Sequence, residues 1–127
     1  MIVKMFKPRF AELVRAGAKK QTVRPKPKRR PTPGALISCR MWSGLPYRSK
    51  QVELCRGVVQ SVHDFWFKGV TILIDDPMAR KPRMKQEEME AFARADGFAS
   101  LSEMADWFKD EHGELPFCGI VIKWENL

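Results

Sequence analysis

The chain has 127 residues, the length of one ordinary domain and too short for two independent hydrophobic cores. Hydrophobic residues make up 44% of it, and no apolar run approaches the ~18 residues of a membrane span, so we expect neither a disordered nor a membrane-embedded chain. The net charge of +8 is uneven: residues 1–50 hold 14 bases and one acid, whereas residues 51–127 hold 9 bases and 14 acids. Such polarisation is typical of proteins that bind polyanions.

The first third of the chain predicts a short helix, an extended segment and an exposed loop. A helix is expected over 8–16, because its apolar residues recur at helical spacing and Gly17 can take the left-handed stop. Residues 21–24 favour an extended conformation, and Pro25 keeps the residue before it out of the helical region. Four prolines and several charges over 25–34 predict a semi-rigid loop in solvent.

The remainder predicts strands, then helices, then a last strand. Alternating or continuously apolar runs predict strands over 35–42, 52–62 and 70–74, the last of them buried on both faces, with a turn-rich loop at 43–50. Helices are expected over 84–95 and from a capping box at 100–103 to Gly113, followed by a strand over 117–124. This order disfavours a doubly wound sheet. We predict an α+β fold, a single domain over 1–127 built as a small, partly closed mixed β-barrel with helices at its side.

The cysteines and histidines predict no metal centre. Cys39, Cys55 and Cys118 lie far apart without a C-x-x-C spacing, and only two histidines accompany them. We interpret the cysteines as buried thiols in a reducing cytoplasm, and we expect no cofactor.

A first candidate site lies where the first helix ends and the extended segment begins. If the strand starts early enough, its period of two places Lys20, Thr22 and Arg24 on one face, and Lys19 at the turn is free to point towards the same cleft. Ammonium, hydroxyl and guanidinium groups that converge in this way suit an anionic or carbonyl-bearing ligand. The alternative is a solvated basic turn.

A second candidate lies around the 43–50 loop, which we expect to follow a strand that neighbours Thr22. Trp42 and Tyr47 offer stacking surfaces of the kind that bind single-stranded nucleic acid. The alternative is that Trp42 caps the barrel and Tyr47 completes a turn. The phosphate partners expected across both regions are Lys20, Arg24, Lys26, Lys28, Arg29, Arg30, Arg40, Arg48 and Lys50.

Three segments together resemble the ASCH-domain family of the PUA-like β-barrel superfamily: AGAKKQTVRP, the G-x-L-I-S strand entry at Gly34, and DGFASLSEM. The resemblance implies RNA binding, and some members remove the acetyl group from acetylated cytidine with a lysine, a threonine three residues later and a downstream acid. By position these are Lys19, Thr22 and Asp96. The chain departs from those amidohydrolases in two places: they carry a glutamate at the acid position, and commonly a threonine where Lys20 stands.

Three hypotheses follow. The protein is a module that binds RNA or a nucleotide-like ligand in a basic cleft, or it is a metal-independent hydrolase in the same cleft. The hydrolase would be an amidohydrolase of a modified nucleoside such as acetylcytidine, or a ribonuclease. The third hypothesis is an adaptor whose acidic C-terminal half binds a basic protein.

Overall fold

In the computed structural model, which describes residues 1–78, 80 and 82–127, three helices accompany one six-stranded sheet. This combination confirms the α+β class. In chain order the elements are β1 (Ile2–Met5), α1 (Pro8–Arg15), β2 (Gln21–Pro25), β3 (Leu36–Trp42), β4 (Gln51–Phe67), β5 (Ile72–Ile74), α2 (Gln86–Ala95), α3 (Leu101–His112) and β6 (Phe117–Asn126).

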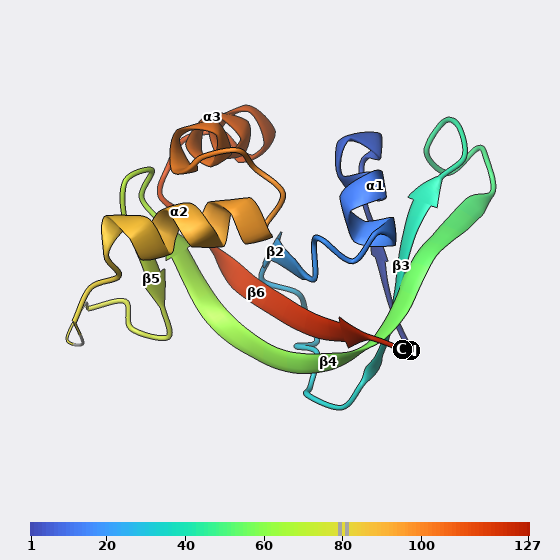
Figure 1. The fold of residues 1–127 in the computed structure, drawn as a ribbon, viewed down its shortest axis with the longest axis horizontal. Helices are drawn as coiled ribbons and strands as arrows, with labels where there is room; N and C mark the ends of the chain where they lie inside the picture. Colours follow the sequence, from blue (N-terminus) through green and yellow to red (C-terminus); the bar gives the residue numbers. More distant parts are fainter. Residues whose placement is uncertain (79, 81) are drawn as a thin grey trace.

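The sheet is strongly curved, and the helices lie on its concave side (Figure 1). Its strands run in the order β1-β3-β4-β6-β2, with β5 paired to β4; β1 and β3 are parallel, and the other pairs are antiparallel. The 17-residue β4 pairs with β3 along its first half and with β6 and β5 along its second half. Buried residues from the sheet and from all three helices form one hydrophobic cluster, in which Trp124 and Phe65 are among the largest fully buried side chains.

The described strands form an open sheet instead of the expected barrel. The path of paired strands ends at β1 on one side and at β2 on the other, and these two edges share no ladder. One side chain crosses between them: Arg24 of β2 donates through Nη2 to the backbone oxygen of Met5 at 2.7 Å. The two edge strands are therefore close to each other, although no backbone ladder joins them.

Several predicted boundaries differ from the observed ones. The strand expected over 52–62 continues to Phe67, because its second half pairs with β6. The strand expected over 70–74 begins at Ile72: Lys68 donates to the backbone oxygen of Thr71 in a turn, and Val70 is 75% exposed instead of buried. β1 was not predicted at all, since four residues are too few for a clear period.

β2 and β6 approach each other closely at Gly119. Pro25 lies opposite this glycine in the register, and a Cβ built on Gly119 would lie 2.2 Å from the backbone oxygen of Arg24. Any larger residue would push β2 away from β6. This matters for function, because β2 carries the residues of the first candidate site.

Candidate functional site

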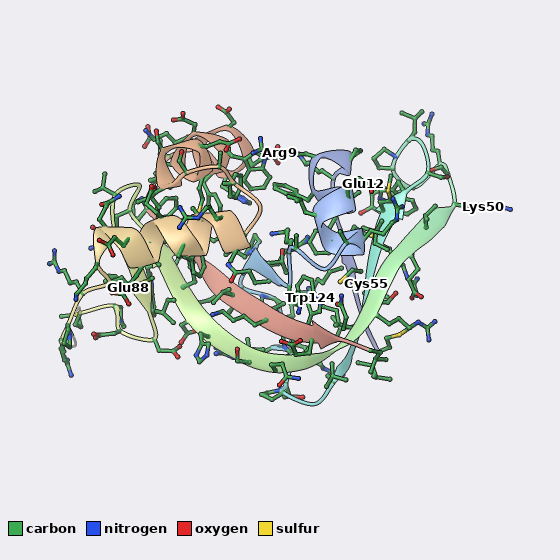
Figure 2. The ribbon with its side chains drawn as sticks, viewed as in Figure 1. Arg9, Glu12, Lys50, Cys55, Glu88 and Trp124 are labelled. Carbon is green, nitrogen blue, oxygen red and sulfur yellow. The ribbon has the colours of Figure 1, made fainter. Side chains whose placement is uncertain are left out.

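A cavity of about 190 Å³ opens between the edge strands β1 and β2 and the helices α1 and α3. Four residues singled out in the sequence line it together: Lys19, Thr22, Arg24 and Asp96. Most of the remaining wall is apolar or aromatic, and its aromatic members are Phe6, Phe10, Phe98, Trp107 and Phe108. Figure 2 shows side chains filling the space between α1 and the other two helices. The polar groups are thus gathered in an otherwise aromatic surrounding.

Lys19 reaches the cavity from the turn that follows α1. Gly17 adopts a left-handed φ of 78°, and the backbone nitrogen of Lys19 donates to Leu13, which fixes the direction of the chain. The Lys19 side chain is 4% exposed, and its Nζ donates to the backbone oxygen of Asp96 at 2.5 Å and to Oδ1 at 3.2 Å. Gln21 Nε2 donates to the same Oδ1 at 3.4 Å.

The buried pair of Lys19 and Asp96 is shifted towards its neutral forms. Burial lowers the pKa of Lys19, and the charge and hydrogen bond of Asp96 oppose this shift. Burial raises the pKa of Asp96, and the ammonium of Lys19 opposes that shift. The two groups are therefore suited to exchanging a proton with each other or with a ligand in the cavity.

Thr22 and Arg24 lie on the same face of β2, as the period of two predicts. Arg24 Nε donates to Thr22 Oγ1 at 3.0 Å, which leaves the hydroxyl proton of Thr22 free to donate elsewhere. The guanidinium carbon of Arg24 lies 4.9 Å from the ring centroid of Phe6. Burial lowers the pKa of the Arg24 guanidinium. In the described part of the chain, Arg24 has no carboxylate in an ion pair with it. Lys19 and Lys7, which also line the cavity, are each in an ion pair, so the charge of Arg24 is the one available to a ligand.

Lys20 does not join this group, contrary to the prediction. β2 begins at Gln21, and the side chain of Lys20 points to another surface, where its Nζ lies 3.3 Å from Glu125 Oε2. The basic residues of the proline-rich segment do not line the cavity either: Lys26, Lys28 and Arg29 are exposed, and Arg30 Nη1 donates to Asp64 at 2.7 Å.

The loop after β3 is not next to Thr22, so that part of the second candidate was wrong. β3 pairs with β1 and β4, whereas the strand of Thr22 pairs with β6. The Trp42 and Tyr47 rings lie 5.1 Å apart, and Tyr47 is 89% exposed, so this aromatic pair forms a separate surface. Arg40 is held by Ser38 and Gln51, and the two other bases of this region are Arg48 and Lys50; none of the five predicted residues lines the cavity.

The fold also brings bases of the first half onto acids of the second half. Lys7 pairs with Glu111, and Arg9 pairs with Glu103, so two ion pairs link the start of α1 to α3 across the cavity. The positive field predicted from the sequence is therefore partly neutralised within the fold.

Some residues of the cavity carried no functional signal in the sequence. The aromatic residues of α1 and α3 follow the same spacing as ordinary core residues, and β1, which supplies Met5, was not predicted. His112 lines the wall, and burial lowers its pKa. Only the helical spacing of these residues was visible, and it indicates burial without indicating a cavity.

Comparisons with family models, with curated proteins and with solved structures find no match for this chain. Among the described residues, no helix is long and apolar enough to cross a membrane. The same residues contain no group of three or more histidines, cysteines, aspartates or glutamates placed to hold a metal ion.

Proposed function

We propose that the protein is an amidohydrolase that acts on a small modified nucleoside in the cavity between β1, β2, α1 and α3. The observation that carries this proposal is the buried Lys19–Asp96 pair beside the Thr22 hydroxyl. A buried ion pair alone is often structural. Here, however, both partners and the hydroxyl line one open cavity, and their burial favours proton transfer between them.

Each residue has a role in amide hydrolysis. The lowered pKa of Lys19 favours a neutral amine that accepts a proton from the attacking group. Thr22 either attacks the carbonyl carbon or positions the attacking water, and Arg24, already bonded to Oγ1, offers its charge to the developing oxyanion. Asp96 carries the proton on to the leaving amine. Water adds across the amide bond, which releases acetate and the free nucleoside.

The cavity fits the part of such a substrate that reacts. Its volume of about 190 Å³ is below the ~300–1,000 Å³ of sites that enclose drug-sized ligands. A single base with its acyl group suits this volume better than a stretch of polymer does. Phe6, Phe10 and Trp107 are among the aromatic side chains of its wall, which offers apolar contacts to a flat base.

We also infer that the chain is a PUA-like ASCH domain with a barrel that is incompletely paired. The bond from Arg24 to Met5 supports this inference, because it spans the two edges that a closed barrel would pair through backbone atoms. The cytoplasmic location expected from the cysteines stays part of this proposal.

The test is turnover of acetylcytidine by the purified protein, followed by the release of cytidine. Lys19→Ala is expected to abolish release, whereas Lys20→Ala, which removes the adjacent exposed lysine, is expected to leave it unchanged. Circular dichroism of both variants separates loss of chemistry from loss of the fold. Equal activity of the two variants would exclude Lys19 from the reaction.

A second comparison tests whether the hydroxyl of Thr22 takes part in the reaction. Thr22→Ser keeps a hydroxyl that can accept from Arg24, and Thr22→Val keeps the shape of the side chain but removes the hydroxyl. If the hydroxyl takes part, the serine variant retains turnover and the valine variant loses on the order of 10²-fold or more. Similar turnover in both variants would show that the hydroxyl is dispensable.

RNA binding is a second candidate function, and the exposed Trp42–Tyr47 ring pair favours it. Arg48 and Lys50 lie in or beside the same loop and offer phosphate partners, while stacking on an aromatic ring contributes ~1–3 kcal/mol per base. The expected result is binding of single-stranded RNA that weakens as the salt concentration rises, with a slope reduced in Lys50→Ala. Binding that is independent of salt would refute this role.

A further inference from the structure

Two cysteines face each other across neighbouring strands on the concave side of the sheet. Cys39 of β3 and Cys55 of β4 are direct partners in the antiparallel register, and the register shifts immediately after Cys39. Opposed residues in such a ladder have Cα atoms ~4.5–5.5 Å apart, which lies within the ~4.4–6.8 Å that disulfides span. Cys39 is fully buried, Cys55 is half-buried, and both are free thiols.

The two thiols are also close enough to influence each other's pKa. Burial is the largest influence and raises the pKa of both, and the proximity of Cys55 raises that of Cys39 further. Cys55 is the more accessible of the two thiols, so it is the one that an oxidant in solution reaches first.

We propose that Cys39 and Cys55 are an oxidation site, at which a hydroperoxide converts the two thiols into a disulfide between β3 and β4. This proposal does not rest on the proposed hydrolase activity, because neither cysteine lines the cavity of Lys19 and Asp96.

The chemistry proceeds in two balanced steps. The Cys55 thiolate attacks one oxygen of hydrogen peroxide, which breaks the O–O bond and gives a sulfenic acid at Cys55 and one water after protonation. The Cys39 sulfur then attacks the sulfenic sulfur, its proton leaves with the hydroxyl as a second water, and the S–S bond forms. The peroxide gains the two electrons that the two thiols lose.

The bond would close a loop at the base of the β3–β4 hairpin. It encloses residues 40–54, a segment that contains the exposed Trp42–Tyr47 pair. A disulfide that closes a loop of this length raises the unfolding temperature by on the order of 10 °C if the native geometry accepts the bond.

The experiment treats the full-length Cys118→Ser variant with hydrogen peroxide, then denatures it in an alkylating reagent and measures the intact mass. Cys118 is exposed, and its removal prevents disulfides between molecules. The expected product is about 2 Da lighter than the starting protein and takes up no alkyl group, whereas the reduced protein takes up two. Because burial raises the pKa of both thiols, the reaction is expected to be faster at pH 9 than at pH 7.

Two controls make the result decisive. Cys39→Ser in the same background removes the second thiol, so Cys55 is expected to stay alkylatable or to oxidise further without losing 2 Da. The protein with Cys118 in place reports that the oxidant is active, since this exposed thiol reacts first. Two alkylatable thiols under conditions that oxidise Cys118, or a sulfinic acid at Cys55 in the Cys118→Ser variant, would overturn the proposal.

Discussion

The buried pair of Lys19 and Asp96 is expected to make a much larger contribution to stability than an exposed pair of the same kind. The chain offers a close comparison, because Lys20 and Glu125 form an ion pair at 3.3 Å and Lys19 and Asp96 one at 3.2 Å. The side chains of the first pair are 44% and 63% exposed, and those of the second pair only 4% and 5%. Burial is the main difference between them.

The magnitude follows from this burial. At 3.2 Å and an effective dielectric constant of about 20, two unit charges attract by about 5 kcal/mol, although the loss of hydration offsets much of this. Lys19→Met leaves the Asp96 carboxylate without its partner, and breaking a buried pair in this way costs about 3–5 kcal/mol of unfolding free energy. Lys20→Met is expected to cost under about 1 kcal/mol, since exposed pairs contribute little.

The assay is urea unfolding followed by tryptophan fluorescence, since Trp124 is buried. A double-mutant cycle of Lys19→Met and Asp96→Asn isolates the coupling, and the double variant is expected to lose about 2 kcal/mol less than the sum of the single variants. The cost of Lys19→Met is expected to shrink as the pH falls. The reason is that burial raises the pKa of Asp96, so the folded state takes up the compensating proton first. An additive cycle, or equal costs for Lys19→Met and Lys20→Met, would refute the reasoning.

Three further outcomes are expected. Ser100→Ala removes the oxygen that caps α3 and should cost about 1 kcal/mol in the same urea assay, with no change if another group takes over the cap. Gly119→Ala places a methyl group against the backbone of Arg24, so we expect a loss of more than about 2 kcal/mol in thermal unfolding; a wild-type transition would contradict this close approach. Burial raises the pKa of Asp75, but hydrogen bonds from His63 and a backbone amide hold this pKa below its usual value of 3.8. The contribution of the Asp75 carboxylate to stability is therefore present above pH 3.8 and is lost as the pH falls through the lowered pKa. His63→Ala should raise this pKa in a carboxyl NMR titration, and an unchanged value would remove His63 as its cause.

Features that depend on neighbouring residues were predicted from the sequence. The helix α1 and its left-handed stop at Gly17, the proline-rich loop and the capped start of α3 each follow from a few adjacent residues, and the structure contains all of them. The α+β class followed from the order of these elements. The common face of Thr22 and Arg24 followed from the period of a strand.

The tertiary structure alone decided which distant groups meet. Lys19 and Asp96 are 77 residues apart, and only the resemblance, not the pattern of residues, singled out Asp96 before the fold placed it against Lys19. Lys20 was expected on the face of Thr22 and Arg24 because the strand was assumed to include it, but β2 begins at Gln21, so alternation along the strand does not set the direction of the Lys20 side chain. Likewise, the bases near the N-terminus meet acids of α3 across the cavity, which no local pattern encodes. Periodicity reports on contacts a few residues away, whereas the cavity, the ion pairs and the facing thiols of Cys39 and Cys55 depend on strand pairing and helix packing over the whole chain.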